Sequence, residues 1–296
     1  MSRIKRGDFL EKAALFRRQA EPFSLAEGYK LIILQVFSGL KRTASFDGFN
    51  LTESSSIRQC LLLLKRLNLP AKAVKYSDHV KVLFARCWED LRLLSRLHDR
   101  IFGERRTPKD GSEYGFLLGY PRCCVERFYG GNHRGGRFGF PCEGRKRAQD
   151  GSLEVDYRLN RFSPICVVHH VPCGPDCRAT IEWSDRILSL YKAYDPFLRR
   201  QAEAVLKKPV LLFGINHFLR FFDDIKKDRI FYDSVDAVNP KLFNEDEDLR
   251  VAGLLEQLGN GDQARFEKGS FSVFSGKKLL LKNTFSRQPY QLLRFV

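Results

Sequence analysis

Apolar side chains recur at helical spacing through most of the first hundred residues. An apolar run at residues 25–37, with little polar alternation, predicts a buried helix. Two further runs repeat apolar residues every three or four positions, and these are Ile57, Leu61 and Leu64, then Leu91, Leu94, Leu97 and Ile101. Residues 73–86 instead alternate, which predicts a hairpin that turns at Ser77 and Asp78. The pattern indicates a mainly helical scaffold.

Three short features of this scaffold raise separate expectations. The Asp47-Gly48 pair between Phe46 and Phe49 predicts a reversal of the chain. Cys60 and Cys87 are expected to pack inside the scaffold as small apolar residues. None of these residues suggests chemistry.

In the middle of the chain, helices are predicted to begin soon after prolines. Pro121 leads into a helix whose opening turn contains Cys123 and Cys124. Residues 162–171 read as a strand or extended segment. A long helix is predicted after Cys177, and its apolar face consists of Ile181, Leu188, Tyr191 and Tyr194. Asp195 and Pro196 break this helix, and a shorter one continues to about Leu206.

From residue 208 onward, short apolar runs of β type alternate with turns rich in Gly and Asp. This change predicts a small β-rich domain at the C-terminus. The fold class is therefore expected to be α+β, with a largely helical N-terminal and central Cys-containing region. The expected boundaries are a scaffold at 1–106, a Cys/His motif region at 107–207 and the β-rich domain at 208–296.

The composition is that of a folded, basic protein. Hydrophobic residues make up 43% and aromatic residues 12%, which is too much for a disordered chain. Lys and Arg total 51 against 35 for Asp and Glu, so the formal net charge is +16. The apolar run at 31–37 is far shorter than the ~20 residues that span a bilayer. The first ten residues contain no apolar signal segment, so we expect a cytoplasmic protein without a membrane partner.

Cysteine is concentrated in one part of the chain. Of the eight cysteines, all but Cys60 and Cys87 lie between residues 123 and 177. Reduced thiols, metal binding or thiol chemistry fit such a chain better than structural disulfides. Both Cys123-Cys124 and Cys177 fall at predicted helix starts, where the helix dipole favours thiolates. If either cysteine cluster is considered without the other, the alternative is that its side chains only pack in the core.

The spacing of these residues predicts a metal site. Cys123, Cys173 and Cys177 are the expected thiolate ligands, and His170 is a fourth ligand or a general acid/base. Adjacent residues rarely point at one ion, so one of Cys123 and Cys124 is expected to bind the metal and the other to be buried or to be a nucleophile or redox partner. The sequence leaves open which of the two is the ligand, and Cys124 is the candidate for the nucleophilic or redox role. The donor set suits either an iron–sulfur cluster or zinc, and the sequence leaves this choice open. Cys142 and Cys166 are not expected to be ligands.

Two motifs carry these residues: Gly119-Tyr120-Pro121-x-Cys123-Cys124-Val125-x-x-Phe128 and His170-x-Pro172-Cys173-x3-Cys177. Together they resemble an uncharacterised, largely archaeal family, domain of unknown function 483. The likeness covers about residues 75–207. It implies that the four cysteines and His170 are the polar signature of the family, and it implies no established reaction.

The positive charge indicates a nucleic-acid partner, RNA rather than DNA. Support is strongest between residues 130 and 147, where glycines and phenylalanines are interleaved with basic residues that could contact RNA. These are Arg134, Arg137, Arg145, Lys146 and Arg147. The alternative is that excess Lys and Arg only keeps the chain in solution. The chain has no helix-turn-helix, zinc-finger or RNP motif.

Three functions follow from these observations. The first is a metal- or cluster-dependent enzyme that modifies RNA or a nucleotide-like substrate, with Cys124 and His170 at the catalytic site. The second is a non-catalytic RNA-binding module held together by structural zinc. The third is a metal-free thiol redox protein. The sequence does not predict an oligomeric state.

Overall fold

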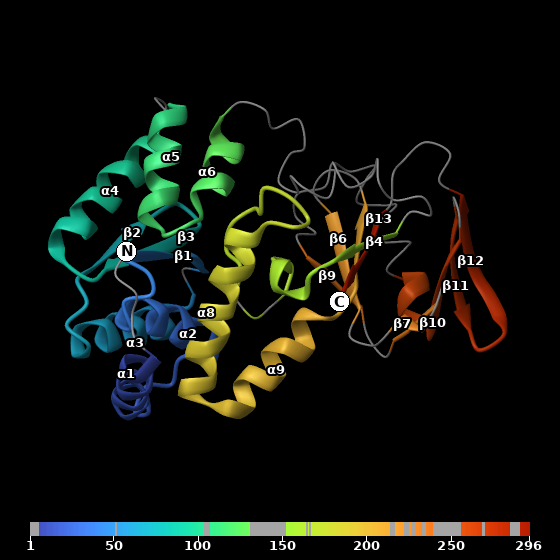
Figure 1. Ribbon diagram of the computed structural model, residues 1–296, viewed down its shortest axis with the longest axis horizontal. Coiled ribbons are helices and arrows are strands. Elements are labelled where there is room, and N and C mark those ends of the chain that lie inside the picture. Colours follow the sequence, from blue (N-terminus) through green and yellow to red (C-terminus); the bar gives the residue numbers. More distant parts are fainter. Residues whose placement is uncertain are drawn as a thin grey trace. The chain divides into compact units, whose positions relative to one another are not determined.

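The structure is a computed structural model (Figure 1). It describes residues 6–50, 52–103, 107–130, 152–163, 165, 167–213, 217–221, 225–226, 229–232, 235–238, 256–267, 270–284 and 291–296. The chain forms two compact units. The first consists of Met1–Asn132, Ile165–His170 and Glu182–Ala202, and the second of His133–Pro164, Val171–Ile181 and Glu203–Val296.

The helices of the described residues lie before residue 207, apart from a short helical segment at 256–259. The longer ones are α1 (Arg6–Ala20), α2 (Glu27–Phe37), α3 (Ser54–Arg66), α4 (Trp88–Phe102), α5 (Pro108–Leu117), α6 (Arg122–Tyr129), α8 (Arg178–Tyr194) and α9 (Pro196–Leu206). The bounds of α2, α3, α4, α6, α8 and α9 confirm the predicted helices, whereas α1 and α5 were not predicted as separate helices. The break between α8 and α9 also occurs as predicted, since the Asp195 carboxylate accepts a hydrogen bond from the Phe197 N–H and caps α9.

The first unit contains a three-stranded antiparallel sheet in the order β1-β3-β2. Its strands are β1 (Thr43–Asn50), β2 (Ala71–Lys75) and β3 (His79–Ala85), and β2 and β3 form the predicted hairpin. Helix α4 packs on this sheet through buried leucines, among them Leu91 and Leu94. A buried hydrogen bond of 3.0 Å from the Gln35 amide to the Tyr191 hydroxyl joins α2 to α8.

Asp47 and Gly48 do not reverse the chain, so that prediction was wrong. Strand β1 continues from Thr43 to Asn50, and its pairing with β3 shifts register between Phe46 and Phe49. The pair therefore forms a bulge inside a strand. Phe46 and Phe49 are both buried, so the strand is held on each side of the irregularity and the turn signal is overridden by packing.

The second unit contains two five-stranded sheets, ordered β4-β13-β5-β6-β9 and β12-β11-β10-β8-β7. The first has β4 (Ser152–Val155), β5 (Val210–Phe213), β6 (His217–Phe221), β9 (Val235–Val238) and β13 (Gln291–Phe295). The second, which we call the outer sheet, has β7 (Ile225–Lys226), β8 (Arg229–Phe231), β10 (Gln263–Glu267), β11 (Ser270–Ser275) and β12 (Lys278–Thr284). Both sheets contribute residues to one hydrophobic core. The predicted change to β structure in the C-terminal part is confirmed.

Two further expectations need correction. The described residues at 161–163, 165 and 167–171 form turns, bends and irregular backbone instead of a strand. The cause is local, because the Asn160 side chain accepts a hydrogen bond from the Phe162 N–H and turns the chain. Cys87 is exposed instead of packed, because it is the cap residue where the chain leaves β3 and enters α4. The division at residues 106 and 207 stays a prediction.

Candidate metal centre

The first cysteine pair is positioned by the turn between α5 and α6. Helix α5 begins with a capping box, in which the Thr107 hydroxyl accepts from the Asp110 N–H and the Asp110 carboxylate accepts from the Thr107 N–H. Its glycines allow α6 to approach closely: a Cβ on Gly111 would overlap the Tyr129 ring, and one on Gly115 would lie 3.0 Å from a Val125 methyl. The two helices therefore pack through a glycine face.

The Gly119-Tyr120-Pro121 sequence ends α5 and starts α6. Gly119 has a φ of +81°, and its N–H donates to the Phe116 carbonyl while the Tyr120 N–H donates to the Gly115 carbonyl. This is a Schellman motif, in which glycine takes the left-handed position at little cost. Pro121 then caps α6. Cys123 and Cys124 consequently lie in the first turn of α6, as predicted.

The second cysteine pair leads into α8. The Cys177 carbonyl accepts hydrogen bonds from the N–H groups of Thr180 and Ile181, at 3.1 and 3.0 Å, so Cys177 is the cap residue of the helix. The Thr180 hydroxyl donates to Cys177 Sγ at 3.2 Å. Thr180 is fully buried. A hydroxyl donor and the start of a helix both favour the thiolate form of Cys177.

The two motifs also meet through rings. The ring centroids of Tyr120 and His170 lie 5.2 Å apart with a tilt of 35°. His170 is buried, with 5% of its surface exposed. The tyrosine of the first motif therefore packs against the histidine of the second.

The sulfur atoms of Cys123, Cys124, Cys173 and Cys177 all lie within 4.8 Å of one another. Within each pair the separation is 3.9 Å for Cys123 and Cys124, and 3.5 Å for Cys173 and Cys177. Among the described residues no disulfide links the cysteines. Four thiol sulfurs at these distances could hold a metal ion.

The four side chains differ in their access to solvent. Cys124 and Cys177 are buried, Cys173 is half-buried and Cys123 is exposed. The cluster therefore has an inner side formed by two buried sulfurs and an outer side at Cys123. The neighbouring residues Arg122 and Arg178 are both exposed and place two positive charges beside the cysteines in sequence.

The structure brings Cys123, Cys173 and Cys177 together as predicted, and Cys124 joins them. The sequence argument placed only one of Cys123 and Cys124 at the ion, because adjacent side chains usually diverge. His170 is not among the four grouped residues and lies against Tyr120 instead. The predicted roles of these residues stay predictions. Arg134, Arg137, Arg145, Lys146 and Arg147, together with Cys142 and Cys166, lie outside the described residues.

Sequence reasoning missed two contributors to this site. Thr180 supplies the hydroxyl next to Cys177, and Tyr120 supplies the ring beside His170. A threonine three residues after a helix cap is a visible signal for the first. The second had no such signal, since a tyrosine between Gly and Pro reads only as part of a turn.

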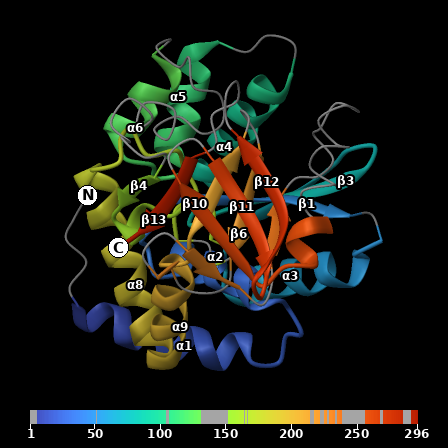
Figure 2. The same ribbon diagram turned by 90° about the vertical axis from the view of Figure 1, so that its right-hand side faces the viewer.

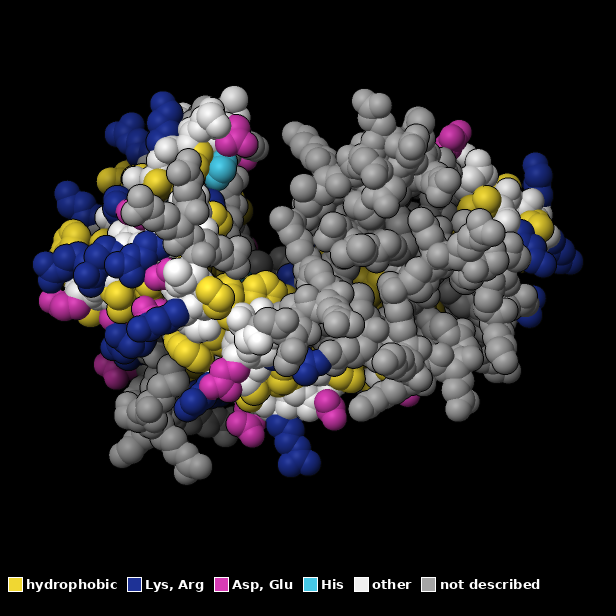
Figure 3. Space-filling model, turned by 90° about the horizontal axis from the view of Figure 1, so that it is seen from above, with side chains coloured by type: hydrophobic (Ala, Val, Ile, Leu, Met, Phe, Trp, Pro, Cys, Tyr) yellow, Lys and Arg dark blue, Asp and Glu magenta, His cyan; other side chains and the backbone are white. Residues whose placement is uncertain are grey.

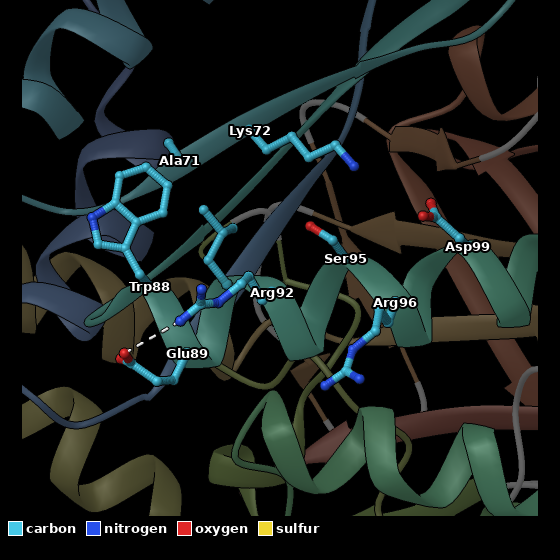
Figure 4. A pocket seen from close by; sticks show the side chains of 9 residues that line it. Ala71, Lys72, Trp88, Glu89, Arg92, Ser95, Arg96 and Asp99 are labelled. Atoms are coloured by element: carbon cyan, nitrogen blue, oxygen red, sulfur yellow. Dashed lines mark hydrogen bonds and ion pairs between the residues drawn. The ribbon is translucent and has the colours of Figure 1, made fainter.

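An open groove elsewhere in the first unit contains none of the predicted site residues. It runs along α4 beside the start of β2, and Trp88, Lys72, Arg92 and Arg96 line it together with Glu89 and Asp99 (Figure 4). Arg92 is directed back to Glu89, with an N–O distance of 3.4 Å. Of the three basic side chains in this groove, Arg92 is thus paired with an acidic one.

Comparison with protein-family models, curated proteins and solved structures found no match for this chain. Within the described residues, no helix is long and apolar enough to cross a membrane. The geometry of the cysteine cluster is therefore the basis for assigning a function.

Proposed function

We propose that Cys123, Cys124, Cys173 and Cys177 bind one zinc ion as four thiolates. Zinc–sulfur bonds of about 2.3 Å in a tetrahedron require sulfur–sulfur separations of about 3.8 Å. The separations of 3.9 and 3.5 Å within the two pairs lie on either side of this value. This agreement is the observation that carries the proposal.

The compactness of the cluster favours one ion over an iron–sulfur cluster. In an iron–sulfur cluster the four cysteine thiolates bind two or four iron atoms, with inorganic sulfide between the irons. The cysteine sulfur atoms therefore lie further apart than around a single ion. Here all four sulfurs lie within 4.8 Å of one another. A single mononuclear ion accounts for this spacing without movement of either helix start.

Four thiolates leave zinc no open position, and closed zinc sites are structural. The bound ion would stabilise the fold and hold the start of α6 next to the cap residue of α8. In this proposal Cys124 is a ligand, the Thr180 hydroxyl supports the Cys177 thiolate, and the His170 ring packs against Tyr120. The non-catalytic RNA-binding module is thereby favoured over the enzyme.

We also propose that the protein binds RNA through basic surface residues. The net charge of +16 supports this, because neutralising phosphates drives such binding. Lys and Arg side chains gather in several groups on the face seen in Figure 3. From the two motifs we also propose that the chain belongs to the family of domain of unknown function 483. This membership implies no reaction.

The zinc proposal is tested by purifying the protein without oxygen and measuring its metals. We expect a colourless protein with one zinc per chain. Cys173→Ser should lose the zinc, whereas Cys87→Ser should keep it, because Cys87 is exposed and lies outside the cluster. A coloured protein containing iron and sulfide, or a chain that binds no metal, would refute the proposal.

A further inference from the structure

The three-stranded sheet of the first unit ends in a strand that is open to a partner. Strand β3 lies beside β1 in both Figure 1 and Figure 2, and β2 pairs with the other side of β3. Within the described part of the chain no further strand pairs with β2, so β2 is an edge of the sheet. Lys72, Ala73 and Lys75 on this strand are exposed.

The backbone of β2 presents hydrogen-bonding groups at this edge. The Pro70 carbonyl accepts a hydrogen bond from the Ala85 N–H at 3.0 Å, which sets the alternation so that even-numbered residues bond to β3. In an antiparallel pair, the residues between them direct their N–H and C=O groups away from the partner strand. The edge therefore offers the backbone groups of Ala71, Ala73 and Lys75 to another strand.

Helix α4 forms a second wall beside this edge, and we call the space between them the α4 groove (Figure 4). Its lining includes Ala71 and Lys72 on the strand side, and a stripe from Trp88 through Arg92 and Arg96 to Asp99 on the helix side. At 1.5 Å per residue this stripe is about 16 Å long, which is about the length of five residues in a strand. Strand β2 also has five residues. An extended segment of five residues therefore matches the groove in length.

Two exposed cations line the α4 groove from opposite walls. Lys72 comes from β2 and Arg96 from α4 (Figure 4). Neither side chain forms a hydrogen bond or ion pair with another residue that the structure describes. Both can therefore bind carboxylates of a partner without breaking an existing contact.

The acidic residues of the groove already face cations. Glu89 accepts a hydrogen bond from Arg92 at 3.4 Å, and the Asp99 carboxylate lies 3.7 Å from His98 Nδ1. Lys75 adds a further exposed cation on β2. Lysines on an edge strand oppose pairing with a second copy of the same strand. The charge of this edge therefore favours an acidic partner over a second copy of the chain.

An exposed tryptophan marks one end of the groove. Trp88 is the first residue of α4, and 62% of its surface is exposed. Figure 4 shows its indole ring next to Ala71, at the start of β2. Tryptophan is among the residues that most often anchor a protein interface, because it buries a large apolar area on binding. An apolar side chain of the partner would cover this ring.

We infer that the α4 groove binds an extended acidic segment of a partner protein, which adds to the edge of the sheet as a fourth strand. The outward backbone groups of β2 would pair with those of the segment. Because side chains alternate along a strand, those on the helix side would place carboxylates near Lys72 and Arg96 and an apolar group on Trp88. This inference is independent of the zinc and RNA proposals.

The test selects peptides from a displayed library of random ten-residue sequences on the full, zinc-loaded chain, and measures the affinity of the best peptide by fluorescence anisotropy. We expect enriched peptides to share acidic side chains at alternate positions and one apolar side chain. Ala73→Pro should abolish binding, because proline removes an outward N–H while the bonds of β2 to β3 remain. Trp88→Ala, and Lys72→Ala combined with Arg96→Ala, should each weaken binding about tenfold.

Matched controls separate these effects from loss of folding. Ala73→Val keeps the outward N–H and should keep the affinity. Phe197→Ala, and Arg58→Ala combined with Lys192→Ala, remove exposed residues of similar types outside the groove and should bind like the unmodified chain. Zinc content and circular dichroism of every variant should equal those of the unmodified chain.

A second measurement alters the peptide and leaves the chain unchanged. Alternate amides of an added strand face β2, and the others face solvent. Methylating one alternate set of peptide amides should therefore abolish binding, and methylating the other set should not. Equal effects of the two sets would contradict strand addition.

The remaining outcomes identify other occupants. The inference is wrong if no peptide is enriched, if basic peptides are enriched, or if a folded Ala73→Pro variant binds the selected peptide as tightly as the unmodified chain. If the Trp88 and Lys72/Arg96 variants lose binding of a ten-nucleotide RNA and bind the peptide normally, the groove binds RNA instead. A dimer that Ala73→Pro dissociates would assign the edge to a second copy of the chain.

Discussion

The described cysteines occupy two contrasting environments. Cys60 lies in α3, fully buried beside Leu63 and Leu64, and burial raises the pKa of its thiol to about 12. Of the four clustered cysteines, Cys123 and Cys124 lie in the first turn of α6, and Cys177 caps α8 and accepts a hydrogen bond from Thr180. Cys173 lies four residues before Cys177. Apolar burial keeps the Cys60 thiol protonated. In the cluster, by contrast, the Cys177 sulfur lies at a helix start and accepts a hydrogen bond from a hydroxyl group.

This contrast shows that burial alone does not determine the role of a cysteine. Cys124 and Cys177 are nearly as buried as Cys60, with 2% and 6% of their surfaces exposed. What differs is their position in the helix, because Cys124 lies in the first turn of α6 and Cys177 caps α8, where the helix dipole favours negative charge, whereas Cys60 lies inside α3. The cluster is therefore suited to hold a cation, and Cys60 is suited only to packing.

The largest expected effect comes from removing one sulfur of the cluster. Cys177→Ser should abolish zinc binding and lower the free energy of unfolding by on the order of 5 kcal/mol, because structural zinc contributes about 10–16 kcal/mol in small zinc peptides. Cys60→Ala should keep the zinc and lose about 1 kcal/mol through a small cavity. Urea unfolding with metal analysis compares the two. Equal losses in both variants would remove the distinction between the two environments.

A second prediction concerns the packing that positions Cys123 and Cys124. Gly111→Ala should destabilise the protein by about 1–3 kcal/mol, because the new methyl group overlaps the Tyr129 ring and forces α5 and α6 apart. Gly28→Ala is the matched control, since nothing lies within 4 Å of a Cβ at that position in α2. Thermal unfolding with and without a chelator would measure both. An unchanged midpoint for Gly111→Ala would contradict the packing described.

Removing the hydroxyl next to Cys177 should have a smaller effect. Thr180→Val keeps the shape of the buried side chain but deletes the donor to the sulfur, and residues of this kind typically change metal affinity 10–100-fold. We expect about a tenfold loss of zinc affinity, with restoration by Thr180→Ser. Competition with a coloured chelator measures both affinities. The interpretation fails if the valine variant binds zinc as tightly as the unmodified chain.

The last prediction concerns stability at alkaline pH and leaves neutral pH unaffected. Because the pKa of Cys60 is raised from 9.0 to about 12 on folding, its contribution is complete below pH 9 and is lost as the pH rises towards 12. Cys60→Ala should flatten this decline by at most about 1.4 kcal/mol per pH unit. The remaining slope would include Tyr194, whose pKa burial raises to about 12. Urea unfolding from pH 7 to pH 11 provides the comparison.

Features encoded by a few neighbouring residues could be predicted from the sequence. The starts of α6 and α8 follow from Pro121 and from the Pro175–Cys177 segment, and the end of α8 follows from Asp195 and Pro196. The grouping of the two cysteine motifs was also expected from their chemistry. The position of the Cys124 sulfur was not, because it depends on how closely α5 and α6 pack through Gly111 and Gly115.

The register of the outer sheet could not be predicted in the same way. Arg229, Arg265 and Lys282 are far apart in the chain, and only strand register places them in one row. A shift of one residue in any pairing would move one of them to the core side. The Asp47-Gly48 bulge illustrates the same limitation, since partner strands override a local turn signal.

The central claim is that four thiolates surround a single ion, and X-ray absorption at the metal edge tests it most directly. The spectrum of protein purified without oxygen should show four sulfur atoms at about 2.3 Å from zinc and no neighbouring metal atom. Scattering from a second metal atom, or a nitrogen ligand in place of one sulfur, would contradict this account.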